Sequence, residues 1–375
     1  MGLTERQLNR ATLDRQLLLS RERLGAVDGV RRVVALQAQQ AASPYIGLWN
    51  RLEGFDPAEL DTAFSSGAVV KATLIRITLH AVVAEDYPSF HGAMQQTLRA
   101  ARLTDMRFRR SGLSTAEADQ LVPRLLAFLD RPRAKGEIEA FLLDEIGDRG
   151  PGVWWALRTY APLLHARTGG AWSFDVRPSF VAAPARLRGT VVPVPVRQLV
   201  RRYLEGFGPA SIADIAQFTL IPRSAVREAV ESMGRDVVRL EGPGPELLDV
   251  PGGRIPDPDT PAPPRLLPMW DSILLAYSDR SRMLPSDLRP LVIRRNGDVL
   301  PTLLVDGQVA GVWRPVEGGI EATAFTPLTE GAWEGLAAEA RELLRFLQLR
   351  DPAVYRRYNH WWAKLPKFEA RLLPS

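Results

Sequence analysis

Residues 197–250 carry the pattern that most restricts what this chain can fold into. Apolar residues recur at helical spacing in three stretches, and a short Ile221-Pro222-Arg223 turn joins the last two. Two short helices across a tight turn are typical of a helix-turn-helix, and two strands after them add a β-hairpin wing. A generic helical subdomain is the alternative. The expected helices are Arg197–Glu205, Ile212–Phe218 and Ser224–Met233, and the expected strands are Val237–Leu240 and Leu247–Val250.

The same order of elements is expected twice more upstream, on weaker signals. In the first copy, helices lead into two short strands with many β-branched residues. In the second copy, a Gly169-Gly170 turn is expected to join the strands of the wing. The first copy has expected helices over Leu3–Leu19 and Val27–Gln40, two more that begin near Pro44 and Pro57, and strands over Val69–Ile75 and Thr78–Val82. The second has expected helices over Thr115–Leu129, Lys135–Ile146 and Val153–Leu164, a strand–turn–strand over Ala166–Phe174, and a linker over Pro178–Pro195.

The last third of the chain is expected to be rich in β-structure. A proline-rich connector over residues 251–268 leads into it. Asn296-Gly297 and Asp306-Gly307 each lie between apolar runs, and both dipeptides are strong hairpin signals. A closing helix is expected over Gly331–Leu347. The expected strands are Leu291–Arg295, Val299–Val305 and Gln308–Trp313.

Together these segments predict an α+β protein. It would have three tandem winged helix-turn-helix modules, followed by a barrel-like β block with its closing helix. A chain of 375 residues is long enough for several such units, each with its own core. The expected boundaries are residues 1–110, 111–190, 191–255 and 256–375.

Several classes of site are disfavoured by what the sequence lacks. There is no cysteine, which excludes disulfides, thiolate nucleophiles, iron–sulfur clusters and cysteine-type zinc sites. The four histidines, at 80, 91, 165 and 360, do not have a metal-binding spacing. Neither a P-loop nor a dinucleotide-binding glycine motif occurs. We therefore expect no metal and no cofactor, nucleotides included.

The charged residues favour a nucleic-acid partner without deciding the matter. The formal net charge is +5, and most of the positive charge is arginine, because lysine occurs only at positions 71, 135, 364 and 367. Arginine matches phosphates and base edges well, although a GC-rich genome would produce the same bias. No apolar run reaches the roughly 20 residues that span a bilayer, and the first residues do not resemble a secretion signal. We expect a cytoplasmic, nucleoid-associated monomer without membrane contact.

Gln37 and Gln39 flank Ala38 near the end of the second expected helix. Glutamines in such a place are most often solvated or cap the end of a helix, because glutamine is polar and a good helix former. Residues i and i+2 point to different faces of a regular helix. Joint action of the two amides would therefore require the helix to end or distort near Ala38, and the Ser43-Pro44 pair downstream favours such a break.

Several motifs together resemble those of the tandem winged-helix DNA glycosylases, the AlkZ and AlkX (YcaQ-like) family. The resemblance extends over roughly residues 4–365. Its Gln-apolar-Gln motif is similar to the AlkZ branch of azinomycin-producing Streptomyces, whereas the AlkX branch has Gln-apolar-Asp. The motifs are Leu36-Gln37-Ala38-Gln39, the strand Thr78–Val82 with Ala84-Glu85-Asp86 after it, the segment Leu267–Arg280 and the paired hairpins.

This resemblance implies three modules around a positively charged, C-shaped cleft for duplex DNA. The implied enzyme is a monofunctional DNA glycosylase that cleaves the N-glycosidic bond of N7-alkylguanine. It would also unhook azinomycin-type interstrand crosslinks and so protect an antibiotic producer from its own product. Gln37 and Gln39 would be its catalytic residues, with no carboxylate at that site.

Two uncharged amides are chemically adequate for such a substrate. Alkylation at N7 makes the guanine cationic, so the base leaves without protonation and water needs only to be positioned. We expect one amide oxygen to accept a hydrogen bond from that water, and the other amide to hold the sugar or a phosphate. Which of the two glutamines binds the water stays open at this point.

A crosslinked base cannot be flipped out without its partner strand, so an open cleft is expected rather than a tight pocket. A hairpin turn and the third module should supply the DNA contacts, although ordinary solvent-facing residues are the alternative. A winged-helix regulator and a drug-sequestering protein are the competing functions. The candidate DNA contacts are Arg294, Arg295, Asn296, Gly297, Asp306 and Gly307 in the two turns, and Arg223 and Arg227 in the third module.

Overall fold

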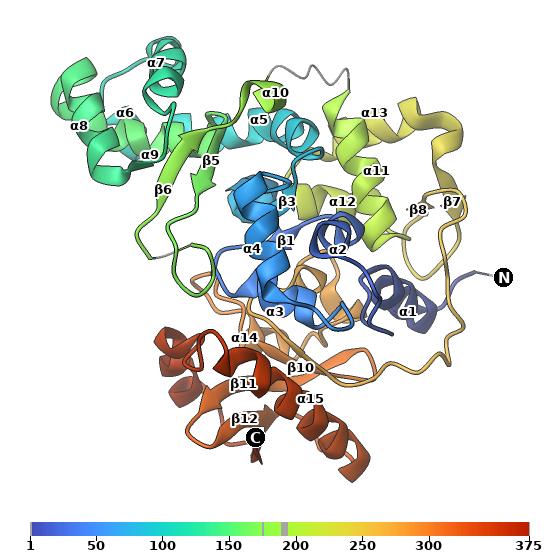
Figure 1. Cartoon of the computed structure of the whole chain (residues 1–375). Coiled ribbons are helices and arrows are strands. Elements are labelled where there is room, and N and C mark those ends of the chain that lie inside the picture. The colour runs from blue at the N-terminus through green and yellow to red at the C-terminus, as the bar shows by residue number, and fades with distance from the viewer. Residues whose placement is uncertain (1, 175, 189–193, 375) are drawn as a thin grey trace.

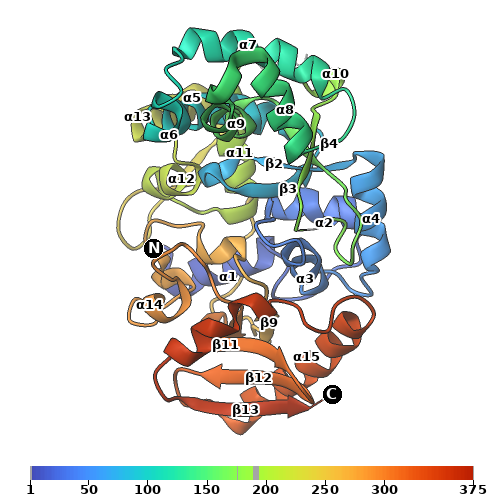
Figure 2. The same cartoon turned by 90° about the vertical axis from the view of Figure 1, so that its left-hand side faces the viewer.

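The computed structural model describes residues 2–174, 176–188 and 194–374. These residues are stacked in three tiers, which are clearest in Figure 2. Residues 106–188 form the tier at one end, and residues 302–374 form the tier at the other (Figures 1 and 2). Helices alternate with separate sheets whose paired strands are antiparallel, which confirms the expected mixed class of helices and strands.

The first unit packs helices around a small sheet of order β1-β3-β2. Its first helix begins at a capping box, in which the Thr4 side chain accepts from the Gln7 amide. Its fourth helix follows the cap Asp56 and ends at Gly67, which adopts a left-handed conformation. The elements are α1 (Glu5–Arg15), α2 (Ala26–Val33), β1 (Leu36–Gln37), α3 (Ser43–Trp49), α4 (Pro57–Ser66), β2 (Val69–Thr73), η1 (Ile75–Ile77), β3 (Leu79–Val83) and α5 (Tyr87–Leu103).

The expected helix over Val27–Gln40 is wrong in its second half. Helix α2 ends at Val33, and Val34 has a φ of 73°, which is rare for a β-branched residue. Val34 is fully buried, and its side chain lies against the helix that contains Gly206. The chain therefore leaves the helix early and continues as strand β1, which pairs with β3.

The second unit confirms two expected helices and corrects its wing. Helix α8 has the expected bounds, and helix α7 ends one residue earlier than expected. The expected Val153–Leu164 helix ends at Tyr160, and the wing strands are separated by a long loop rather than by a Gly169-Gly170 turn. The elements are α6 (Met106–Arg109), α7 (Thr115–Phe128), β4 (Arg133–Ala134), α8 (Lys135–Ile146), η2 (Gly147–Arg149), α9 (Gly150–Tyr160), β5 (Leu163–Ala166), β6 (Ser179–Ala182) and α10 (Ala185–Arg188).

The linker expected over Pro178–Pro195 contains β6 and α10, and residues 189–193 of it lie outside the described residues. The third unit then follows the expected order closely. Ser211 caps its second helix through a capping box with Asp214, and Leu220 turns the chain toward the third helix. The elements are α11 (Pro195–Phe207), α12 (Ile212–Thr219), α13 (Arg223–Met233), η3 (Gly234–Asp236), β7 (Val238–Leu240) and β8 (Leu247–Asp249).

The C-terminal block is an open sheet of order β13-β12-β11-β10-β9, and no closed barrel is found among the described residues. The expected barrel-like closure is therefore wrong. The hairpin across Asp306-Gly307 and the closing helix are confirmed, whereas Leu291 and Val292 belong to a short helix instead of a strand. The elements are β9 (Arg265–Leu267), η4 (Ser272–Leu274), η5 (Arg280–Arg282), α14 (Arg289–Val292), β10 (Thr302–Val305), β11 (Gln308–Val316), β12 (Gly319–Ala324), α15 (Glu330–Gln348), η6 (Arg356–Lys364) and β13 (Glu369–Pro374).

Two buried ion pairs tie the first unit to later parts of the chain. Arg15 donates two hydrogen bonds to the carboxylate of Asp249, at 2.6 and 2.7 Å, and both side chains are at most 3% exposed. Arg51 donates in the same way to Asp271, with both N–O distances 2.9 Å. Each pair is bidentate, which is the geometry that best offsets the loss of water around two charges.

Candidate active site

Gln37 lies in a closed cluster of polar groups. The residue is 5% exposed, and its Oε1 accepts a hydrogen bond of 2.5 Å from Nη2 of Arg76. Arg76 and Ile77 have φ values of 53° and 58°, so the loop between β2 and β3 is strained where it brings this guanidinium inward. The Arg76 guanidinium lies 4.7 Å from the centroid of the Phe218 ring, which faces it from α12.

Two buried nitrogens of the same cluster have no hydrogen-bond partner among the described residues. They are Nη1 of Arg76 and Nε2 of His80. Burial and the nearby Arg76 lower the pKa of His80 to about 3, so this histidine is neutral at physiological pH. Its Nδ1 lies 3.1 Å from the Thr78 carbonyl, to which it donates, and the lone pair of Nε2 remains free. The amide oxygen of Gln37 is occupied, while its Nε2 can still donate.

Gln39 lies in different surroundings from Gln37. The chain leaves strand β1 after Gln37 and bends, and the side chain of Gln39 is exposed. It borders a cavity of about 600 Å³ that is lined by the first and second units and by two residues of the C-terminal block, and Gln37 is not part of that lining. Gln37 instead borders a space of about 10 Å³, roughly the volume of one water-sized probe. The bend after Gln37 thus places the two amides in different surroundings.

The register of the small sheet assigns the neighbours of Gln37 and those of the cavity to different faces. Gln37 pairs with His80, which pairs with Ala72, so these three share one face of the sheet. Lys71 and Leu79 occupy positions of the opposite face, and both border the cavity with Gln39. One face therefore holds the Gln37–Arg76–His80 cluster, and the other faces open space.

The two arginines expected in the third module are exposed on one helix. Arg223 is the first residue of α13, which follows the turn after α12, and Arg227 lies one turn further along. This position corresponds to the second helix of the expected helix-turn-helix. Both side chains are available for a ligand on that face of the helix.

The turn over Arg294–Gly297 is held by aromatic side chains rather than by two strands. A single bridge joins Ile293 to Val299. The Arg294 guanidinium lies 4.7 Å from the centroid of the Trp361 ring, and Trp270 Nε1 donates to the Gly297 carbonyl at 3.0 Å. Asn296 donates to Asp298, and both Asn296 and Arg295 are exposed at the tip.

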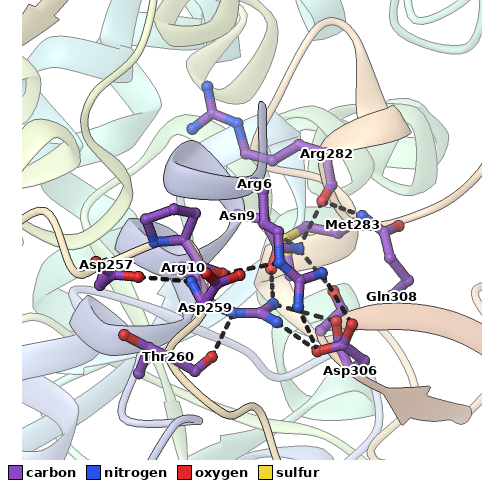
Figure 3. A network of polar contacts seen from close by, with 12 residues as sticks. Arg6, Asn9, Arg10, Asp257, Asp259, Thr260, Arg282, Met283, Asp306 and Gln308 are labelled. Carbon is purple, nitrogen blue, oxygen red and sulfur yellow. Dashed lines mark hydrogen bonds and ion pairs between the residues drawn. The ribbon is translucent and has the colours of Figure 1, made fainter. Parts of the chain in front are cut away.

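The turn over Asp306-Gly307 is packed against helix α1, as Figure 3 shows. The Asp306 carboxylate forms ion pairs with Arg6 and Arg10, and the Gly307 carbonyl accepts from Asn9 Nδ2 at 2.7 Å. A side chain added at Gly307 would meet Asn9 Oδ1 at 2.5 Å. These contacts fix the turn against α1, while the Asp306 side chain is still 56% exposed, and its contact with a DNA groove stays a prediction.

The family model of the DNA glycosylase AlkZ-like proteins matches residues 30–346, which is more than half of the chain. This chain belongs to the AlkZ-like DNA glycosylase family. It is similar in structure to the DNA glycosylase AlkZ of Streptomyces sahachiroi, with 21% identity and a TM-score of 0.78 over 92% of this chain and 97% of that one. At this identity the similarity shows a shared fold. None of the curated proteins matches the chain.

Family membership makes DNA the substrate class of this protein. No helix in the described ranges combines the length and the apolar character that crossing a membrane requires. Across the same ranges, no three histidine or acidic side chains are grouped so that they could hold a metal ion.

Residues that the sequence did not single out complete the site. Arg76 holds Gln37, and Lys71, Arg102 and Arg158 border the cavity next to Gln39. Lys71 had one weak signal, because it is a lysine inside an apolar strand of a chain with four lysines. Arg76 gave no signal in the sequence, because its role depends on a strained loop that no turn motif predicts.

Proposed function

We propose that this chain hydrolyses the N-glycosidic bond of N7-alkylguanine in duplex DNA and unhooks interstrand crosslinks of the azinomycin type. The observation that carries the proposal is the Gln37-Ala38-Gln39 segment, which presents one amide to an open cavity and fixes the other through Arg76. Membership of the glycosylase family supplies the reaction class. In an antibiotic producer, such an enzyme would confer self-resistance.

The geometry favours a division of labour between the two amides. Gln39 is exposed, so we assign its Oε1 the hydrogen bond from the attacking water. The Oε1 of Gln37 is held by Arg76 in an enclosed cluster, so we assign Gln37 the support of the segment that positions Gln39. The base already carries positive charge, so no acid is needed to expel it, and the transition state is oxocarbenium-like. Hydrolysis then leaves the free base and an abasic site, as in a monofunctional enzyme.

The three helix-and-strand units would act as winged helices around a C-shaped cleft. Arg223 and Arg227 on α13, and Arg295 and Asn296 at the turn after α14, are the proposed phosphate and groove contacts. A crosslink joins two bases on opposite strands. An open cleft of this kind lets the enzyme approach the damaged nucleotide without extracting it from the duplex.

The test is excision from defined duplexes. The purified protein should release free base and leave an abasic site from duplex with N7-methylguanine or an azinomycin crosslink. It should show little activity on uracil, because neutral amides do not assist an uncharged leaving group. Gln37→Ala and Gln39→Ala should each lower the excision rate about 100-fold while DNA affinity is kept. Gln120→Ala, on the exposed face of α7, is the matched control.

Three results would reject the proposal. Full activity of both glutamine variants would remove the amides from the mechanism. Tight binding of a two-fold symmetric operator without any excision would indicate a regulator. Stoichiometric capture of the free alkylating drug, with no product from damaged DNA, would indicate a sequestering protein.

A further inference from the structure

The cavity beside Gln39 has a strong excess of positive charge in its lining. Among the described residues, four cationic side chains border it, and the one acidic side chain is Asp351, which accepts a hydrogen bond of 3.2 Å from Trp172 Nε1. The cationic side chains are Lys71, Arg102, Arg158 and Arg357.

Lys71 is the most enclosed of these cations. It extends from β2, and the residue is 6% exposed. Its Nζ lies 4.3 Å from the centroid of the Phe174 ring, and no carboxylate forms an ion pair with it in the described part of the chain. Burial alone lowers the pKa of Lys71 to about 8. An ammonium group that is taken out of water without a counter-charge is unfavourable, unless a ligand supplies that charge.

The three arginines add to the positive charge around the cavity. Arg102 Nε donates to Thr159 Oγ1 at 3.1 Å, and its guanidinium lies 4.4 Å from the centroid of the Trp155 ring. Arg357 donates to the Tyr358 hydroxyl. Within residues 2–174, 176–188 and 194–374, none of Arg102, Arg158 and Arg357 forms an ion pair. His165, also in the lining, is kept neutral because burial and the nearby Lys71 lower its pKa to about 3.

We propose that this cavity is a binding site for a backbone phosphate of DNA, with Lys71 as the central contact and Gln39 at its edge. The inference deepens the proposed function, because it takes the ligand to be the duplex on which Gln39 acts. An N7-alkylated base is cationic and would be repelled by these four side chains, whereas a phosphodiester would neutralise them. The phosphate would fix the register of the damaged strand, so that the glycosidic bond lies next to the amide.

The experiment combines one protein variant with one neutral linkage in the DNA. Lys71→Met removes the charge and retains an unbranched apolar chain that suits a buried strand position. Binding is measured by fluorescence anisotropy on lesion-free duplex and on duplex with N7-methylguanine, each with a single methylphosphonate placed in turn along the strand. Lys135→Met, at an exposed lysine of α8, is the matched control.

The proposal predicts three results together. Lys71→Met weakens binding of both duplexes about tenfold and lowers the slope of log K against log salt by about 0.9. A methylphosphonate at one position, or at either of two adjacent positions, weakens DNA binding by the wild-type protein about tenfold. A methylphosphonate at that same position does not weaken DNA binding by Lys71→Met any further, because this variant has already lost the contact with the phosphate. Since binding is read on lesion-free DNA, a failure of excision does not affect this test.

Other outcomes would overturn the proposal. An identical methylphosphonate profile in wild type and Lys71→Met would show that no backbone phosphate contacts this lysine. Competition by inorganic phosphate, combined with an unchanged DNA profile, would make free phosphate the ligand. Borohydride trapping of wild type, but not of Lys71→Met, on abasic DNA would show that the amine attacks the sugar aldehyde as a nucleophile instead of holding a phosphate.

Discussion

Replacing Lys71 by methionine should stabilise the protein at neutral pH. The ordinary pKa of a lysine is 10.5, and burial lowers that of Lys71 to about 8. Each unit of difference in pKa corresponds to about 1.36 kcal/mol, so the charged lysine destabilises the folded state by roughly 3 kcal/mol relative to the unfolded chain. The free energy of unfolding of Lys71→Met should therefore exceed that of wild type by up to about 3 kcal/mol at pH 7.

The dependence on pH separates this electrostatic effect from packing. Between pH 8 and 10.5 the unfolded chain keeps the lysine proton while the folded protein has released it. Protons bound by the unfolded state make stability rise with pH in this window, so wild type should approach Lys71→Met as the pH increases to 10.5. Any gain in the free energy of unfolding that comes from packing of the methionine side chain would be the same at every pH.

Urea unfolding of both proteins at a series of pH values provides the measurement. Lys135→Met serves as the control, since Lys135 is exposed and forms an ion pair with Glu139, and its effect should stay below about 0.5 kcal/mol. The reasoning would be refuted if Lys71→Met were less stable than wild type at pH 7. A difference between the two proteins that stays constant from pH 8 to 10.5 would refute it equally.

Three further predictions concern the site and the frame that holds it. Arg76→Met should lower the single-turnover excision rate about 10- to 100-fold with unchanged duplex affinity, because it releases Gln37 Oε1, and Arg76→Lys should restore part of the rate. Arg223→Ala combined with Arg227→Ala should lower the salt slope of DNA binding by about 1.8 without affecting single-turnover excision at saturation; an unchanged slope would exclude them as phosphate contacts. Asp271→Asn should cost about 3 kcal/mol or more in urea unfolding, because it leaves Arg51 buried without a counter-charge, while Glu53→Gln, in the exposed pair with Arg23, should cost less than about 1 kcal/mol.

The sequence predicted best those elements whose ends are fixed by local chemistry. Helix α12 begins at the Ser211–Asp214 capping box, and the β10–β11 hairpin turns at Asp306-Gly307, where both residues have positive φ. Helix α8 was predicted with its observed bounds. In these cases the residues that stop or start an element are adjacent to it, so a reading of the sequence can find them.

The errors lie where distant contacts override local preference. Val34 leaves the helical conformation where it is buried against α11, which no nearby residue indicates, and Leu163 and Leu164 become a strand that pairs with β6. The edge strand β13 forms only because β12 offers it a free edge. For the site, the glutamine pair was visible in the sequence, whereas the separation of Gln37 from Gln39 depends on the bend after β1, and the support from Arg76 depends on the strained loop between β2 and β3.

Helix α1 has implications for synthesis of the chain. Asn9 and Arg10 are held by carbonyl groups of Arg282, Asp306 and Gly307. A ribosome that adds about 5 to 20 residues per second completes these partners roughly 15 to 60 s after the helix itself. Throughout that interval the first turns of the helix lack these partners, although Arg15 at its other end can already bind Leu204 and Asp249. The protein should therefore acquire its final form late in translation, and a nascent chain that stalls before the β10–β11 turn should be open to proteolysis at its N-terminus.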